Sequence, residues 1–154
     1  MKHLTNLFAT LAIALVGLFA TVNGAVASER YGTQQAVYHI NYPGGDSDKA
    51  YIGALRNIQN HINAVGAENM EVRVVLHGNG VGLLSNALAN DTLQTRVVEL
   101  KGQGVAFNVC NNTLVGRNID YENDLFDVWE SDIVPSGVAE LSYLQQQGFT
   151  YIKP

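Results

Sequence analysis

The order of strand-like and helix-like segments constrains the fold of this chain more than any other feature. β-branched and aromatic residues gather in four short runs, which are residues 35–42, 70–76, 105–109 and 149–152. Between these runs, apolar residues recur every three or four positions, as on one face of a helix. Because parallel strands need crossover connections and the loops are short, this alternation predicts an α/β fold. We expect a three-layer α/β/α domain around a mostly parallel sheet of about five strands.

Residues that commonly cap helices precede the segments with helical periodicity. The candidate caps are Asp46 or Ser47, Asn90 or Asp91, Asn111-Asn112-Thr113, and Ser136. The first helix is expected to run to about Val65, where Gly66 ends it. A short helix is expected over residues 81–88. The apolar face of the last helix is expected to consist of Val138, Leu141 and Leu144.

The first 27 residues have the three parts of a cleavable export signal. A weakly basic start at Lys2 precedes an apolar stretch over residues 7–22, and Ala25-Val26-Ala27 forms a small-residue cleavage site. A membrane anchor is the alternative, but the apolar stretch is shorter than the ~20 residues that a span needs. We therefore expect a signal peptide at residues 1–27, a single domain at residues 28–154, and a periplasmic or secreted location.

Charge and hydropathy exclude some classes of partner. The chain has 9 basic and 14 acidic residues, a formal net charge of −5, and loss of Lys2 with the signal makes the mature chain more acidic still. An acidic surface is unsuited to nucleic acid and to anionic membranes. No segment after the signal is apolar enough to span a bilayer. We therefore expect no nucleic acid partner, and no membrane contact after cleavage.

Cys110 is the only cysteine in the sequence, so no intramolecular disulfide can form. It follows the third β-rich run and precedes an expected helix. Ligands of open α/β sheets gather beyond the carboxyl ends of the strands, and a helix N-terminus there stabilises a thiolate. The alternative is an inert packing residue, since unpaired cysteines are among the most buried residues. The position alone leaves both interpretations open.

Several other polar residues are expected at the same edge of the sheet. His77 follows the second β-rich run, where it can help to ionise the thiol or, as we favour, hydrogen-bond within its own turn. The candidate ligand-binding residues are Gly78, Asn79, Asn111, Asn112 and Thr113. The glycines of the turn have neither dinucleotide-binding nor P-loop spacing. His39 lies inside the first run and is expected to be structural.

The sequence offers no convincing metal site. One cysteine with scattered histidines is a poor zinc site, and the acidic stretch of residues 120–132 lacks the glycine of a calcium loop. We expect neither a metal nor a cofactor. The acidic stretch is expected to be a solvated loop or a surface that faces a partner. An aromatic residue within it, such as Trp129, can anchor a subunit contact.

The segment Gly104-Val105-Ala106-Phe107-Asn108-Val109-Cys110-Asn111-Asn112-Thr113-Leu114 resembles the strand-and-cysteine segment of DsrE/DsrF-like proteins. The similarity extends from Val37-Tyr38-His39-Ile40 through Val74-Val75-Leu76-His77-Gly78 to the C-terminal residues 134–154. The chain is most similar to the exported DsrE-like subgroup, which is related to the TusD-type sulfur-relay subunits. The resemblance implies a homo-oligomer in which Cys110 carries a persulfide between a sulfur donor and an acceptor. With no second cysteine, that sulfur must arrive from, and leave to, another molecule.

Three hypotheses remain open on the sequence. The leading one is an exported sulfur carrier, a sulfurtransferase-like protein at most, that holds a persulfide on Cys110 while exchanging sulfur with partner proteins or small sulfur compounds. The second is a non-catalytic module that binds a small ligand or assembles oligomers, with Cys110 as a structural residue. The third is a redox role in which Cys110 pairs with its counterpart in another subunit.

Overall fold

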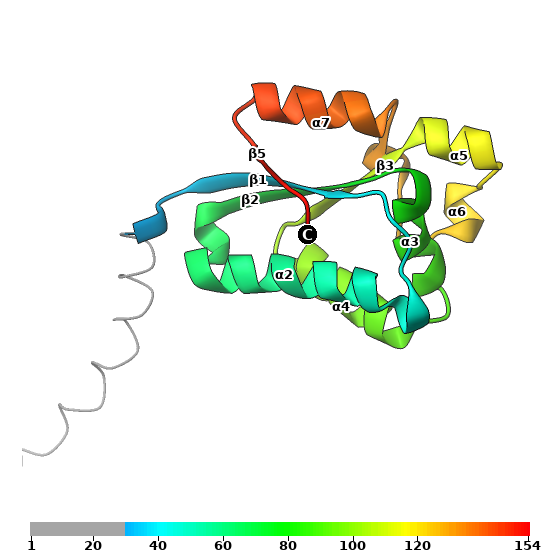
Figure 1. Cartoon of the computed structure of the whole chain (residues 1–154), viewed down its shortest axis with the longest axis horizontal. Coiled ribbons are helices and arrows are strands. Elements are labelled where there is room, and N and C mark those ends of the chain that lie inside the picture. Colours follow the sequence, from blue (N-terminus) through cyan, green and yellow to red (C-terminus); the bar gives the residue numbers. More distant parts are fainter. Residues whose placement is uncertain (1–29) are drawn as a thin grey trace, which may run out of the picture.

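A computed structural model describes residues 30–154; the predicted signal at residues 1–27 lies outside this part. The described part forms a five-stranded sheet in the order β4-β3-β2-β1-β5, in which every neighbouring pair is parallel. Helices lie on both faces of the sheet, as Figure 1 shows. The three-layer α/β/α prediction is therefore confirmed.

The strands are β1 (Gln34–Ile40), β2 (Met70–Leu76), β3 (Ala106–Cys110), β4 (Ile133–Val134) and β5 (Thr150–Ile152). The α-helices are α2 (Lys49–Val65), α3 (Gly82–Ala87), α4 (Asp91–Gly102), α5 (Asn111–Arg117), α6 (Tyr121–Asp124) and α7 (Gly137–Gln146). Four single turns of 3₁₀ helix complete the fold: η1 (Asp46–Asp48), η2 (Ala67–Asn69), η3 (Gly78–Val81) and η4 (Glu130–Asp132).

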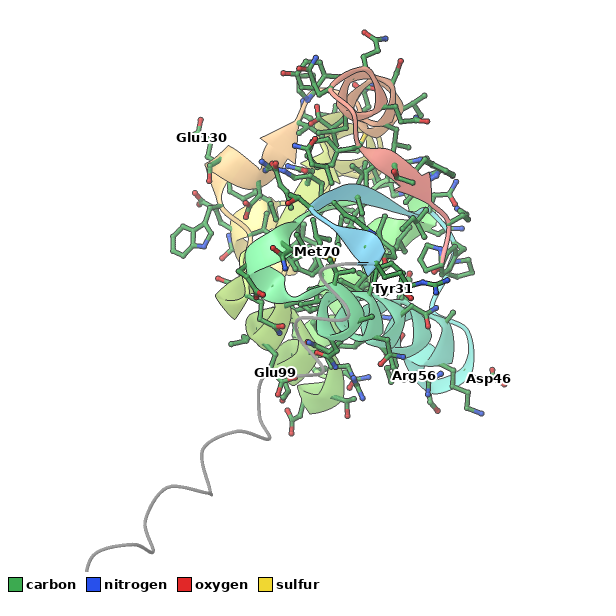
Figure 2. All side chains as sticks on the ribbon, turned by 90° about the vertical axis from the view of Figure 1, so that its left-hand side faces the viewer. Tyr31, Asp46, Arg56, Met70, Glu99 and Glu130 are labelled. Carbon is green, nitrogen blue, oxygen red and sulfur yellow. The ribbon has the colours of Figure 1, made fainter. Side chains whose placement is uncertain are left out.

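The larger core lies between the sheet and the helices α2, α3 and α4. Its buried members include Tyr38 of β1, Ile58 of α2 and Leu93 of α4, and α5 contributes Leu114 to the same cluster. In Figure 2, side chains fill the space between this helical layer and the sheet, while Asp46, Arg56 and Glu99 project outward. Dense burial of apolar side chains here supplies most of the hydrophobic stabilisation.

The opposite face of the sheet is covered by α7 and has a much smaller core. That core consists of Val37, Val75, Leu141, Leu144 and Phe149. Because side chains alternate along a strand, the residues that share this face with Val37 and Val75 include His39 and Asn108. This face of the sheet therefore carries polar side chains beside its small apolar core.

Most of the expected helix boundaries agree with the structure. Gly66 ends α2 with a positive φ of 97°, and its N–H donates to the carbonyl of Ile62. The side chain of Asn90 caps α4, and that of Ser136 caps α7 by accepting from the N–H of Ala139. These are the residues that capping chemistry selects, because their side-chain oxygens satisfy otherwise unpaired N–H groups.

Three expectations about the helices were wrong. Asn111, Asn112 and Thr113 do not cap α5, because they lie inside it and Cys110 occupies the cap position. Asp46 and Ser47 do not cap α2, because they form the 3₁₀ turn η1 and Asp48 occupies the cap position in a left-handed conformation. The Asp48 carboxylate instead accepts hydrogen bonds from the side chains of Asn86 and Asn90, so it ties α2 to α3 and α4. Val138 does not belong to the buried face of α7, since 65% of it is exposed.

Each of the four predicted runs contains a strand, namely β1, β2, β3 and β5, but the ends of some strands differ from the prediction. Residues 70–76 are β2 as expected, whereas β1 ends at Ile40 and β3 extends to Cys110. β4 was not identified, because its two residues lie between the acidic stretch and Pro135 and carry no alternating pattern. Among residues 30–154, no helix is long and apolar enough to cross a membrane.

Candidate functional site

Cys110 is the last residue of β3, at the carboxyl edge of the sheet. It pairs in register with Val134 of β4, which lies on one side of it, and β2 lies on the other. The chain leaves β2 toward α3 on the α2–α4 face, whereas it leaves β4 toward α7 on the opposite face. Cys110 thus lies at a point where the connections diverge, which is where open α/β sheets place ligand sites.

The Cys110 thiol faces hydrogen-bond donors from two helices. Burial raises the pKa of this thiol, but the N–H of Gly137, the hydroxyl and N–H of Thr113 and the N–H of Asn112 outweigh burial and lower its pKa overall. Thr113 Oγ1 accepts from the N–H of Gly78 at 2.9 Å, which leaves its own hydrogen to donate to the sulfur. These donors favour the thiolate of Cys110 over its thiol more than water does.

Gly137 is the point of closest approach between α7 and the pocket around Cys110. A Cβ atom at Gly137 would lie 2.9 Å from Cβ of His77 and 3.3 Å from Cβ of Cys110. No side chain fits there, so glycine lets the first N–H of α7 reach the sulfur. The same contact shows that His77 and Cys110 are neighbours across adjacent strands.

The His77 side chain was expected to bond within its own turn, but it instead takes part in a row of hydrogen bonds that runs across the sheet. His77 Nε2 lies 2.6 Å from His39 Nε2, and His39 Nδ1 lies 2.7 Å from the Tyr151 hydroxyl. Burial, with Lys153 and His77 adding to it, lowers the pKa of His39 to about 4. Burial and the nearby Lys153 also lower the pKa of His77. Both imidazoles are consequently neutral at neutral pH.

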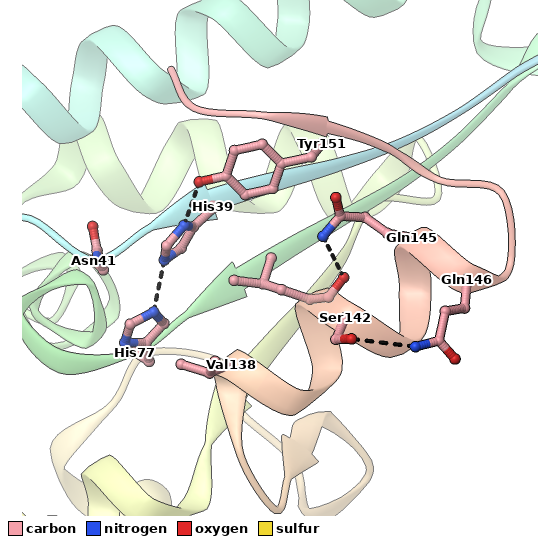
Figure 3. Close-up of a pocket in the computed structure, with 9 residues that line it drawn as sticks. His39, Asn41, His77, Val138, Ser142, Gln145, Gln146 and Tyr151 are labelled. Atoms are coloured by element: carbon pink, nitrogen blue, oxygen red, sulfur yellow. Dashed lines mark hydrogen bonds between the residues drawn. The ribbon is translucent and has the colours of Figure 1, made fainter.

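An open groove of about 710 Å³ lies between α7 and the strands β1 and β5. The hydrogen-bonded side chains of His77, His39 and Tyr151 form one of its walls (Figure 3). The groove is lined by His39, Asn41, His77, Val138, Leu141, Ser142, Gln145, Gln146 and Tyr151. Its lining contains amides, hydroxyls and imidazoles but no carboxylate. It extends to His77 and Val138, which flank the Cys110 pocket. Cys110 itself does not line the groove, which reaches toward the thiol only as far as His77 and Val138.

A sequence model of the DsrE/DsrF-like family matches residues 37–154 of the chain, which include every strand residue from Val37 onward and Cys110. The chain belongs to the DsrE/DsrF-like family. A solved structure, that of the protein of unknown function MTH1491 from Methanobacterium thermoautotrophicum, is similar with a TM-score of 0.64 and 31% sequence identity. The similarity covers 79% of this chain and 99% of that one. A comparison with curated proteins finds no match.

In this DsrE/DsrF-like domain, the structure gathers only some of the predicted ligand-binding residues around Cys110. Gly78 and Thr113 are joined by a hydrogen bond, and the N–H of Asn112 points to the thiol. The amide of Asn79 is engaged elsewhere, since its Oδ1 accepts from Arg117. Asn111 is exposed in the first turn of α5.

The glycines of the turn after β2 serve packing. Gly80 lies against the end of β1, where any Cβ would collide with the carbonyl of Ile40, and a Cβ at Gly82 would lie 2.8 Å from the Tyr51 hydroxyl. Gly78 is the turn glycine of this group, with a positive φ of 54°, whereas Gly80 and Gly82 are required by close packing. Within residues 30–154, no three His, Cys, Asp or Glu side chains are grouped as a metal ion would need.

The acidic stretch is partly folded into the domain. Leu125 and Val128 are buried in the larger core, whereas Trp129 is 66% exposed. Lys101 pairs with Asp127 at 3.0 Å and with Asp132 at 3.7 Å, so this cation holds the segment against α4. Trp129 therefore lies at the surface, whereas Phe126 packs against the larger core.

Sequence reasoning missed three residues of this site: Gly137, His39 and Tyr151. His39 was taken as structural, yet it shares a face with Val75 and is bonded to His77. Strand alternation held a usable signal, because His39 follows Val37 by two residues as His77 follows Val75. Gly137 and Tyr151 come from elements far along the chain, and nothing in their local sequence indicates contact with Cys110 or His39.

Proposed function

We propose that this protein is an exported sulfur carrier that holds sulfane sulfur as a persulfide on Cys110. The observation that carries the proposal is the place of Cys110 at the end of β3, directly before α5 and in contact with the first residue of α7, where backbone N–H groups lower the pKa of its thiol. Such donors stabilise a thiolate, which is the form that attacks sulfur. They stabilise equally the negative charge of a bound persulfide. Membership of the DsrE/DsrF-like family points independently to a role of the sulfur-relay type.

The transfer is a displacement at sulfur with no net oxidation. Cys110 Sγ attacks the outer sulfur of a donor R–S–SH, and the S–S bond of the donor breaks. The electron pair of that bond leaves on the inner sulfur, which becomes R–SH when it takes up a proton. Cys110 is left as Cys110–S–SH. Because the chain contains one cysteine, a thiol or another nucleophile of a second molecule must collect the sulfur.

Intact-mass spectrometry of the purified protein tests the proposal. The folded protein is incubated with an inorganic polysulfide or an alkyl persulfide, desalted and weighed. We expect a mass gain of one sulfur atom, its loss on treatment with a thiol reductant, and no gain in Cys110→Ser. An unchanged mass in the wild-type protein, under conditions in which a small-molecule thiol is converted, would contradict the proposal.

The export part of the proposal rests on the sequence of residues 1–27. An exported carrier works where the cytoplasmic relay partners of related proteins are absent, and where a resting thiol is exposed to oxidants. Expression of the full chain, followed by cell fractionation and N-terminal sequencing, tests it. We expect a periplasmic or secreted protein that begins at Ser28. An uncleaved chain that stays in the cytoplasm would be inconsistent with export.

One observation favours the second candidate, a binding module with a structural cysteine. Only 5% of Cys110 is exposed, as is usual for a packing residue. In this case the groove holds a ligand and the thiol does no chemistry. The two candidates separate in the mass experiment, because a structural cysteine gains no sulfur in the folded protein and reacts only after unfolding. The same burial argues against a disulfide between subunits.

A further inference from the structure

Tyr151, His39 and His77 form a line of hydrogen bonds along one wall of the groove beside α7. His77 Nε2 lies 2.6 Å from His39 Nε2, and His39 Nδ1 lies 2.7 Å from the Tyr151 hydroxyl. Figure 3 shows the three side chains in a row, with Tyr151 at the end away from His77. Tyr151 is 41% exposed and both imidazoles are partly exposed, so the line is open to a molecule in the groove.

The sheet register explains why these side chains share one wall. His39 pairs with Val75, and His77 lies two residues beyond Val75 on the same face. Tyr151 pairs with Val37, two residues before His39, so its ring also lies on this face. The line therefore crosses β5, β1 and the end of β2 on the side that α7 covers.

The line can hold one additional proton without the loss of a hydrogen bond. When both imidazoles are neutral, its hydrogen bonds can run in either direction, because hydroxyl and neutral imidazole each donate and accept. When one imidazole is protonated, His39 Nδ1–H donates to the Tyr151 oxygen, a single proton stays between the two Nε2 atoms, and His77 Nδ1 carries the third. A further proton would place two N–H groups head to head between the rings. The histidine pair therefore carries a charge of zero or one.

A second tyrosine–histidine pair in the same protein lies on the other face of the sheet. His61 Nδ1 lies 2.8 Å from the Tyr38 hydroxyl, and His61 Nε2 lies 2.8 Å from Gln34 Oε1. The Gln34 amide nitrogen donates to the carbonyl of Tyr31, which fixes Oε1 as the acceptor. Neutral His61 must therefore carry its proton on Nε2 and accept from Tyr38. This pair holds one arrangement and does not line the groove, so it serves as an internal reference.

The charges around the groove favour an anion. The chain has 14 acidic residues, yet no carboxylate lines the groove. Lys153 is the cation that acts on both imidazoles, and its ammonium group donates to Oδ1 of Asn41, which lines the groove. The α7 side contributes no titratable group to the lining, and Cys110 lies beyond His77, outside it. A cation without an opposing acid gives the groove a positive potential.

The size of the groove and the rest of its lining indicate the kind of anion. A volume of about 710 Å³ falls in the range of about 300–1,000 Å³ in which small organic molecules bind. Val138, which is 65% exposed, and Leu141 offer apolar contact on the α7 side. The groove therefore suits an organic molecule with an apolar body and one acidic group better than a lone inorganic ion.

We propose that the groove binds a small organic acid, with its anionic group toward Lys153 and the Tyr151–His39–His77 line and its apolar body against Val138 and Leu141. The bound anion favours the uptake of one proton by the histidine pair, because a nearby negative charge stabilises imidazolium. A wall that is neutral in the empty groove thus acquires a positive charge together with the ligand. The site goes beyond the proposed function, since it does not use Cys110.

Two probes of the same shape test the site. Benzenesulfonate is ionised at every pH used, whereas benzenesulfonamide is neutral, and phenylacetate serves as a carboxylate of similar size. Each probe is added to the folded protein while NMR follows the imidazole signals of His39, His77 and His61. We expect both acids to shift His39 and His77 with a dissociation constant of about 1 mM or lower, the sulfonamide to bind at least about tenfold more weakly, and His61 to stay unchanged. Saturating benzenesulfonate should raise the pKa of the histidine pair by about one unit or more.

A pair of lysine variants tests the charge. Lys153→Gln should weaken the binding of benzenesulfonate about threefold to fivefold, as expected for a partly solvated cation. Lys49→Gln, in the first turn of α2, is the matched control and should leave the binding unchanged.

The site is overturned if neither acid shifts His39 and His77 in a saturable way, or if the sulfonamide binds as well as the sulfonate. Equal weakening by the two lysine variants removes the role of Lys153, and an unchanged pKa of the pair at saturation removes the proton uptake. Failure of this site and failure of the sulfur carrier can be told apart. The gain of sulfur mass on Cys110 is measured without any organic acid, and the imidazole shifts are measured without any sulfur donor.

Discussion

The two faces of the sheet differ in how they are covered and in what they carry. The face toward α2, α3 and α4 has a large apolar core that extends from Tyr38 to Val128. The α7 face has five buried apolar residues and carries the Tyr151–His39–His77 line and Cys110. The difference indicates that one face stabilises the fold, which frees the other to hold polar, reactive groups that a dense core would not tolerate.

Each face also has a tyrosine–histidine pair, and the pairs sharpen the comparison. On the well-covered face, Gln34 fixes the tautomer of His61. On the thinly covered face, His39 meets a second histidine, and its tautomer is not fixed. The same two side chains thus serve as a structural pair in one place and as a reversible one in the other. The second hydrogen-bond partner of each histidine, Gln34 for His61 and His77 for His39, decides whether its tautomer is fixed.

The largest expected contrast is in stability. Leu93 of α4 is fully buried in the larger core, and Leu141 of α7 is 7% exposed in the smaller one. We expect Leu93→Ala to lower the free energy of unfolding by about 4 kcal/mol and Leu141→Ala by about 2 kcal/mol, because α7 can settle toward the sheet. Urea unfolding measures both losses of stability. The slope of the unfolding free energy against urea concentration should equal that of the wild-type protein. Equal losses would show that the α7 core stabilises the fold as much as the larger core does, contrary to this account.

Gly137→Ala should damage the thiol site more than the fold. The new Cβ would crowd Cβ of His77 at 2.9 Å and push the first N–H of α7 away from the sulfur. We expect a stability cost of about 1–3 kcal/mol and a rise in the pKa of Cys110, with alkylation at mildly acidic pH slowed about tenfold. Gly116→Ala in α5 is the matched control, since nothing lies within 4 Å of its added Cβ. A Gly137→Ala protein with wild-type alkylation rates would show that this N–H does not act on the thiol.

The Thr113 hydroxyl has a smaller expected effect. Thr113→Val keeps the shape and the backbone N–H but removes the O–H that donates to Cys110 and the oxygen that accepts from Gly78. Loss of one such bond should slow native alkylation of Cys110 about threefold to tenfold at mildly acidic pH. Thr113→Ser should restore the rate. A serine variant that is as slow as the valine variant would assign the effect to packing.

The smallest expected effect is a change in how stability depends on pH. The pKa of His39 is about 4 in the folded protein and near 6.5 in the unfolded chain, so the unfolded state binds more protons between these values. Stability should therefore fall as the pH drops from about 6.5 to 4. His39→Gln should flatten this part of the profile, measured as the unfolding temperature against pH. A slope identical to that of the wild-type protein would mean that His39 is not held neutral by the fold.

The fold could be predicted from the sequence because its signals are local. Strand alternation, Gly66, Asn90 and Ser136 all act within a few residues, and they placed the main elements and the position of Cys110. β4 could not be predicted, because two residues carry no period and are held only by pairing with β3.

Only part of the site could be predicted from the sequence. Cys110, His77 and Thr113 follow strands that meet at one edge, so topology alone brings them together. Gly137 and Tyr151 reach the site only because α7 crosses the sheet and β5 returns beside β1. The role of His39 depends on its bond to His77, and these two residues are 38 positions apart in the sequence.

The rate of Cys110 alkylation in the folded protein, measured against pH, tests the central claim most directly. The claim is that the thinly covered face holds a thiol whose pKa is lowered by the N–H groups of α5 and α7. We predict that iodoacetamide modifies the native protein with a midpoint pH below the ~8.5 of an ordinary cysteine. Modification with a midpoint at or above that value, or modification only after unfolding, would contradict the claim and leave Cys110 as a packing residue.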